Sequence, residues 1–209
     1  MSEPWSALID ITLFGRWLHI VSSIVWIVWL VSLCRATSLR AGRIAAGRQA
    51  WWSVLVLATG VLMLSMQVET MSARLFPAIV AAVFMFLNAW LVIWPQKRLL
   101  LVAEKQLVAG GESLPEADAA LVKCRRVAAV NLMLVVPVSF FMTAGAHHSV
   151  ALAADPAWLL LLLTALALFC LMESAVWLTR QVLPLWTALM LGTTATAMLW
   201  SLFVFWPQT

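Results

Sequence analysis

The three histidines are the side chains of this sequence best suited to holding a metal or a heme. His19 lies within one long apolar run, whereas His147 and His148 lie at the end of another. A heme iron with two histidine ligands needs imidazoles from two helices at compatible depth, and only His19 with His147 or His148 joins separate runs. Because neighbouring side chains point about 100° apart around a helix, only one member of the adjacent pair can face the interior.

Small residues surround His19 if its run is helical. Gly15 precedes it by four positions and Ser23 follows it by four, so both lie on the same helix face. A flat, bulky group such as heme b could then approach the backbone, and Arg16, one turn nearer the helix start, could pair with a propionate. The alternative is a hydrogen-bonded histidine in a helix–helix interface, where small residues allow close packing.

A second polar group consists of Asn88, Asn131 and Glu173. Each lies inside an apolar run, and counted from the ends of these runs all three fall in the inner third of the membrane. Polar side chains at such depth usually face the bundle interior. We therefore predict that the three meet, either as a proton or quinone-headgroup site or as an interhelical cluster of satisfied hydrogen bonds.

Three methionines, Met63, Met66 and Met71, lie at the outer end of the second apolar run and in the segment after it. Thioethers bind Cu(I), so copper handling is one hypothesis, while methionine is also an ordinary filler of apolar cores. None of the three cysteines lies in a Cys-x-x-Cys pair or at a zinc-site spacing from a histidine. We expect these cysteines to be isolated thiols.

The composition of the 209-residue chain decides the class of protein. Apolar residues make up 64% and charged residues 11%, with a mean hydropathy of +0.99, whereas soluble domains average about 45–50% and about 25%. A soluble fold is therefore excluded. The net charge of +4 does not indicate nucleic acid, because the basic residues lie between apolar runs. We predict an all-α, polytopic membrane protein that forms one integral membrane domain over residues 1–209.

Six apolar stretches are candidates to cross a bilayer as helices, which takes about 20 residues, and the second of them is short. Residues 95–126 form the long inner loop, in which Gly110-Gly111 would stop a helix over Leu99–Val108. Ser113 and Glu116 have the spacing of a capping box, which would start a helix leading into the fourth span. The predicted six-transmembrane-helix bundle has its spans at about 11–33, 51–66, 76–94, 127–146, 158–178 and 183–206.

Two features of these spans bear on their packing. Pro137 lies inside the fourth span, where it removes one backbone hydrogen bond and should kink the helix. Ala188, Gly192 and Thr196 recur at every fourth position of the sixth span. Such a ridge of small residues is typical of a helix–helix contact in a membrane.

The basic residues set the orientation of the bundle. Of the 13 lysines and arginines, only Arg16 and Arg74 fall on one side, and the others follow the first, third and fifth spans. Cytoplasmic segments carry the excess of such residues, so both termini are predicted to lie outside. We expect a multi-pass protein of the bacterial inner (cytoplasmic) membrane, with its outer face toward the periplasm in a Gram-negative species.

Several segments together resemble a known family. They match the membrane domain of bacterial membrane-bound urate oxidases and its short relatives, and more distantly copper-resistance membrane proteins and heme-b protoporphyrinogen oxidases. The matching residues are Arg16–Ile20, Ile24–Trp26, Phe86–Lys97, Asn131, Pro137, Phe140–Met142 and His147.

The resemblance implies a helical domain associated with electron transfer and heme binding. It places His19 and His147 at the motif histidines, so that His147 is the better candidate for the second ligand and His148 is free to face water. Glu173 falls where the short relatives carry a glutamate in the fifth span. The chain has no Cys-x-x-Cys-His motif, so urate oxidation itself is not expected.

The leading hypothesis is a b-type cytochrome-like membrane subunit that transfers electrons near the outer face of a bacterial membrane. The alternative is a cofactor-free structural or assembly subunit of a larger respiratory or oxidase complex, and copper handling is third. A stand-alone enzyme is less expected, because no nucleophile–base pair or phosphate-binding glycine loop occurs. Expected partners are the lipid bilayer and other membrane subunits or a redox partner.

Overall fold

The structure is a computed structural model of the whole chain, and it describes residues 4–66, 72–112, 114–147, 158–179 and 181–205. Across these ranges the chain is helical and no β-strand occurs. The predicted all-α class is therefore confirmed. In chain order the elements are α1 (Pro4–Cys34), α2 (Leu39–Ser65), the 3-10 turn η2 (Ala73–Leu75), α3 (Phe76–Leu87), the π-helical segment η3 (Asn88–Ile93), α4 (Trp94–Val108), α5 (Pro115–His147), α6 (Trp158–Thr179) and α7 (Leu185–Phe205).

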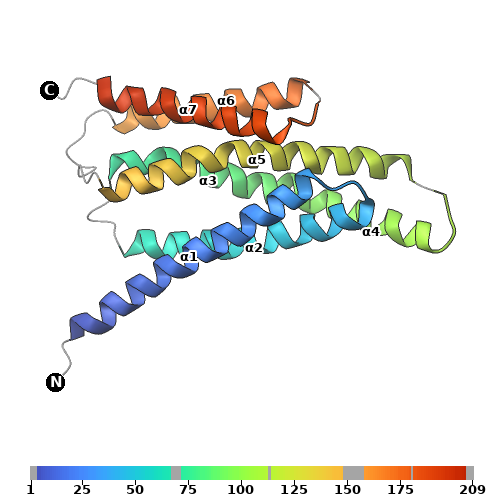
Figure 1. Cartoon of the computed structure of the whole chain (residues 1–209), viewed down its shortest axis with the longest axis horizontal. Helices are drawn as coiled ribbons and strands as arrows, with labels where there is room; N and C mark the ends of the chain where they lie inside the picture. The colour runs from blue at the N-terminus through green and yellow to red at the C-terminus, as the bar shows by residue number, and fades with distance from the viewer. Residues whose placement is uncertain (1–3, 67–71, 113, 148–157, 180, 206–209) are drawn as a thin grey trace.

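The helices lie side by side, and the chain runs back and forth between the two ends of the bundle (Figure 1). α3, η3 and α4 follow one another as one long rod. α1 and α2 form one side, α6 and α7 form the opposite side, and the α3 rod and α5 lie between them (Figure 1). The first part of α1 diverges from the other helices toward the N-terminus (Figure 1), and α1 as a whole contacts mainly α2 and then α5.

Four of the described helical segments are long and apolar enough to cross a membrane. The chain is therefore a membrane protein whose apolar helix faces contact the lipid bilayer. α6 contains a shorter apolar segment, Leu162–Leu178, and α2 carries the arginines Arg40, Arg43 and Arg48 in its first half. The four spanning segments are Leu13–Cys34, Phe76–Val108, Pro115–Gly145 and Leu185–Leu202.

Residues 95–126, predicted as the long inner loop, are mostly helical. α4 extends to Val108, as the Gly110-Gly111 pair predicts, and Gly110 adopts a left-handed φ of 79°. The N–H of Gly111 donates to the Gln106 carbonyl at 3.0 Å and that of Gly110 to the Leu107 carbonyl at 3.1 Å, which together close the helix end. α5 begins at Pro115 and runs directly into the fourth predicted span, while Ser113 lies outside the described residues.

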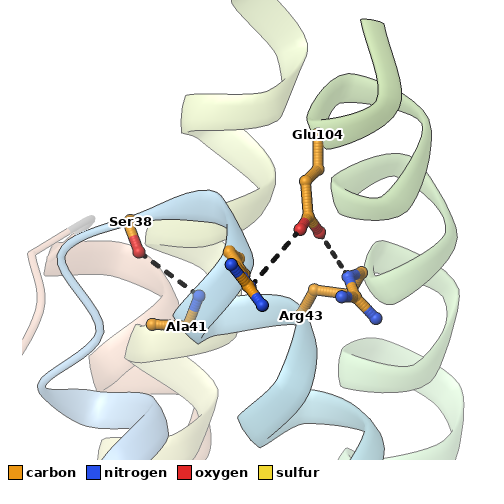
Figure 2. Close-up of polar contacts among 5 residues, drawn as sticks. Ser38, Ala41, Arg43 and Glu104 are labelled. Atoms are coloured by element: carbon orange, nitrogen blue, oxygen red, sulfur yellow. Dashed lines mark hydrogen bonds and ion pairs between the residues drawn. The ribbon is translucent and has the colours of Figure 1, made fainter. Parts of the chain in front are cut away.

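Polar contacts hold the start of α2 against α4 (Figure 2). The Ser38 hydroxyl accepts the backbone N–H of Ala41 at 3.3 Å, and so caps the first turn of α2. Glu104 of α4 accepts a hydrogen bond from Arg43 Nε at 2.5 Å and lies 3.9 Å from Arg40 Nε. These contacts tie the segment after α1 to the far end of the α3 rod.

The π-helical segment η3 has a local cause in the sequence. Pro95 follows it after one residue, Trp94, and has no N–H to donate to a carbonyl of the preceding turn. The helical turn before the proline contains one extra residue, so that the Trp94 N–H donates to the Ala89 carbonyl, five residues back. The wider turn begins at Asn88 and contains Trp90, whose indole N–H donates to the Ser53 hydroxyl of α2 at 3.2 Å.

α5 continues through Pro137 as one helix and meets the ridge of small residues on α7. Because Pro137 lacks an N–H, the Met133 carbonyl has no partner four residues ahead. Gly192 of α7 lies against this carbonyl, and a Cβ added to Gly192 would overlap its oxygen. Ala188 is fully buried and Thr196 is 6% exposed. The predicted packing role of the ridge is therefore confirmed.

Candidate functional site

His19 is buried between α1 and α2. Its Nδ1 lies 2.9 Å from the hydroxyl of Thr59, and that hydroxyl donates to the Leu55 carbonyl at 2.8 Å, with the Val56 carbonyl at 3.1 Å. A hydroxyl has one hydrogen, which the two carbonyls share, so Thr59 accepts the Nδ1–H of His19. The neutral imidazole then carries its lone pair on Nε2, the atom that a metal would bind.

Gly60 determines how closely α2 approaches the imidazole. A Cβ added to Gly60 would lie 3.3 Å from His19 Cε1, tighter than most such contacts, whereas a Cβ added to Gly15 would meet no heavy atom within 4 Å. Ser22 donates to the backbone carbonyl of His19 at 3.0 Å and does not contact the ring. The imidazole is therefore oriented by α2, with open space one turn toward the N-terminus of α1.

The other predicted heme-site residues are placed as follows. Arg16 is exposed and Ser23 is half-buried. α5 ends at His147, whose side chain, like all of His148, lies outside the described part of the chain. Near this helix end, a Cβ added to Gly145 would lie 3.4 Å from Leu75 Cβ. The pairing of His19 with His147 stays a prediction.

The residues fit one half of a heme site. A histidine that binds a heme iron needs a partner that fixes its other ring nitrogen, and Thr59 is such a partner for Nδ1 of His19. Among the described residues no three or more histidine, cysteine, aspartate or glutamate side chains are close enough to hold a metal ion together. Of the three candidate copper-binding methionines, Met63 is half-buried, Met66 is exposed and Met71 lies outside the described residues.

Asn88, Asn131 and Glu173 come together from η3, α5 and α6. The Asn88 amide donates to Asn131 Oδ1 at 2.9 Å and to Glu173 Oε1 at 2.5 Å. The Asn131 amide donates to the Met85 carbonyl at 3.1 Å, where the rod changes from α- to π-helix. The three side chains are 8%, 0% and 9% exposed. The predicted contact among them is confirmed.

This cluster uses both hydrogens of the Asn88 amide, one for each acceptor. We expect Glu173→Leu to lower the free energy of unfolding by about 1–3 kcal/mol, because one buried amide hydrogen loses its acceptor. Glu173→Gln keeps an oxygen acceptor and should lose much less. Unfolding of both variants in mixed detergent, followed by tryptophan fluorescence, measures the difference. Equal stability of wild type and Glu173→Leu would contradict the hydrogen-bonded arrangement.

Sequence reasoning missed several polar partners. Thr59 and Gly60, which orient His19, form a small and polar interruption in the apolar half of α2, and this interruption is the available signal. Gln49 of α2 is fully buried and accepts the indole N–H of Trp26 at 3.1 Å. Its own Nε2 has no hydrogen-bond partner among the described residues.

The fold and these two sites define a class: an α-helical membrane protein with a buried, oriented imidazole between α1 and α2 and a separate carboxyl–amide cluster that joins η3, α5 and α6. Comparisons of the chain with family models, with curated proteins and with solved structures found no match. The resemblance to the urate oxidase membrane domain stays a prediction, and the function must be argued from the residues.

Proposed function

We propose that the chain is a b-type cytochrome-like membrane subunit that transfers electrons near the outer face of a bacterial membrane. The observation that carries the proposal is the way in which the His19 imidazole is buried and hydrogen-bonded. Its imidazole is 7% exposed, and its Nδ1 lies 2.9 Å from the Thr59 hydroxyl, a contact that fixes the ring and leaves Nε2 as the candidate ligand atom.

The residues around His19 would hold the heme b as follows. His19 and His147 would bind the iron, while the missing side chain of Gly15 and the small Ser23 would leave room for the porphyrin. Arg16 pairs with a propionate. A heme held in this way accepts and releases single electrons, and the thioether and thiol groups of the chain are not needed for this role.

The bundle has six spans with both termini outside, in the bacterial inner membrane. This topology is supported by the basic end of the bundle, where α1, α4 and α6 end. Lysines and arginines lie over tryptophan rings there. Arg48 lies 5.7 Å from the Trp29 ring centroid and Lys123 lies 5.8 Å from that of Trp177. Basic residues mark the cytoplasmic side, and tryptophans gather at membrane–water interfaces.

The heme proposal is tested by reduced-minus-oxidised spectra of the protein purified from its native membrane. We expect the α-band of a low-spin b-type heme, abolished by His19→Ala, because the oriented ligand is lost. His147→Ala should lose the band or give a high-spin spectrum, and His148→Ala is the matched control that should leave it nearly intact. A heme-free wild type, or an unchanged low-spin spectrum in His19→Ala, would overturn the proposal.

A heme-free result would favour the second function, a cofactor-free structural or assembly subunit of a larger respiratory or oxidase complex. The hydrogen-bonded Asn88–Asn131–Glu173 cluster supports this alternative, since it joins three elements without any ligand. Co-purification with other membrane subunits would identify it. Copper handling through the outer methionines would instead give a protein that retains copper in metal analysis.

A further inference from the structure

Glu173 has an unusual position for a carboxyl group. It lies about 9 Å inside α6 from the helix end at Thr179, at 1.5 Å per residue, and is 9% exposed. An ionisable side chain at such a position in a membrane helix is unfavourable unless it is paired or functional. The hydrogen bond from Asn88 explains how the group is held, but it does not supply a counter-charge.

The groups that face Glu173 are neutral. Asn88 donates to Oε1, and the indole of Trp177, one turn further along α6, also hydrogen-bonds the carboxyl. α3 and α7, which pack against α6, contain no charged residue. α5 contributes Lys123, whose ammonium lies over the Trp177 ring, 5.8 Å from its centroid. No ion pair to Glu173 occurs among the described residues.

Both protonation states of the carboxyl are compatible with this arrangement. A carboxyl oxygen accepts the Asn88 N–H whether the group is a carboxylate or an acid. A proton can therefore bind and leave while the contact with Asn88 is kept. Without an ion pair, no fixed positive charge holds the group in its ionised form.

The two directions along α6 from Glu173 differ. Toward the basic end lie Trp177 and then Lys123, both half-buried. In the opposite direction Phe169, one turn away, and Ala165, one turn beyond it, are both fully buried within the apolar core. The surroundings of Glu173 are therefore half-buried and polar toward the basic end, and fully buried and apolar in the opposite direction.

We propose that Glu173 is a proton-binding site that exchanges one proton with the aqueous phase at the basic end of the bundle. The carboxylate takes up one H⁺ from water at a carboxyl oxygen and returns it to the same side, and no other bond forms or breaks. Trp177 and Lys123 are positioning residues on this route. The inference goes beyond the proposed electron transfer and does not require that heme is bound.

The test uses the full-length protein reconstituted in lipid vesicles in one orientation. The orientation is determined by labelling the cysteine of the Arg40→Cys variant, in which the changed position is exposed. Dicyclohexylcarbodiimide reacts with protonated carboxyls in apolar surroundings, and peptide mass spectrometry reports the label on Glu173. We expect the labelling rate to fall about tenfold per pH unit above the titration midpoint. It should follow the pH on the basic side only. Trp177→Phe and Lys123→Gln should slow the response to a pH jump, and Glu173→Gln should abolish the label.

Infrared difference spectra provide a second measurement that does not depend on access of the reagent. A pH-dependent carboxylic acid C=O band that is present in wild type and absent in Glu173→Gln supports the proposal. A spectrum with no pH-dependent band at Glu173 overturns it, whatever the labelling shows. Labelling that follows the pH on the opposite face overturns the assigned direction of exchange. None of these outcomes depends on the heme spectrum.

Discussion

Gly192→Ala is expected to destabilise the bundle, although the same change stabilises an ordinary helix interior by about 1 kcal/mol. The added Cβ would overlap the Met133 carbonyl oxygen and lie 3.1 Å from Val136 Cγ2. A backbone oxygen in the middle of α5 cannot turn away as a flexible side chain can. Overpacking of this kind costs about 1–3 kcal/mol or more, which outweighs the gain in helix propensity, and Gly192→Leu should cost more still.

The measurement is the free energy of unfolding in mixed detergent, followed by tryptophan fluorescence. Thr193→Ala is the matched control, because it changes the next residue of the same helix at an exposed position and should stay within about 0.5 kcal/mol of wild type. If Gly192→Ala were as stable as this control, the close contact between α5 and α7 would not exist.

The contact at Gly192 shows which part of the packing can be predicted from sequence. The repeat of small residues on the sixth span predicts that this helix face meets another helix. It does not predict the partner. That partner is the carbonyl freed by Pro137 on α5, and the match depends on how far the two helices slide along each other. From the sequence, Pro137 and Gly192 are two unrelated signals, and only the structure shows that they belong to one contact.

The carboxyl–amide cluster could be predicted because depth in a membrane can be counted along each span. Asn88, Asn131 and Glu173 each interrupt an apolar run, and hydrogen bonding among them is the most favourable arrangement at a shared depth. The π-helical turn that begins at Asn88 could not be predicted from periodicity. The sequence signal for this turn is Pro95, because its missing N–H changes the hydrogen bonding of the preceding turn.

The partner of His19 could not be predicted in the same way. The second half of α2 is apolar around most of its circumference, so its sequence does not reveal which face meets α1. Thr59 and Gly60 reach the imidazole only because of the rotation of α2 about its axis, which packing over the whole helix decides. Ser22, a nearer candidate by sequence, is in a helix and donates to a backbone carbonyl instead, as serine often does there.

The two sites differ in what surrounds them. The cluster at Glu173 lies where α3, α5, α6 and the π-helical turn are packed together, and its side chains satisfy one another. His19 lies against Thr59 and Gly60 of α2, and a Cβ added to Gly15, one turn toward the N-terminus, would meet no heavy atom within 4 Å. The imidazole itself is buried, as Asn131 is, but the position of Gly15, one turn before it on α1, is not filled by another helix.

Gly15→Leu is therefore expected to abolish heme binding while leaving the fold intact. Gly15 lies one turn from His19 on the same face of α1, and a Cβ there would meet no heavy atom within 4 Å, so the folded protein itself can accommodate a larger side chain. A leucine at this position would occupy the space that the porphyrin needs beside the His19 ligand. We expect the α-band of the reduced protein to disappear.

The unfolding free energy of heme-free Gly15→Leu should stay within about 0.5 kcal/mol of the heme-free wild type. Ile24→Leu, a change on the exposed face of α1, is the matched control and should keep both the spectrum and the stability. The combination of an intact fold and a lost spectrum separates a cofactor site from a packing interface, because a packing role for Gly15 would lower stability first. Gly15→Leu protein that kept the full α-band would place the heme elsewhere than on this face of α1.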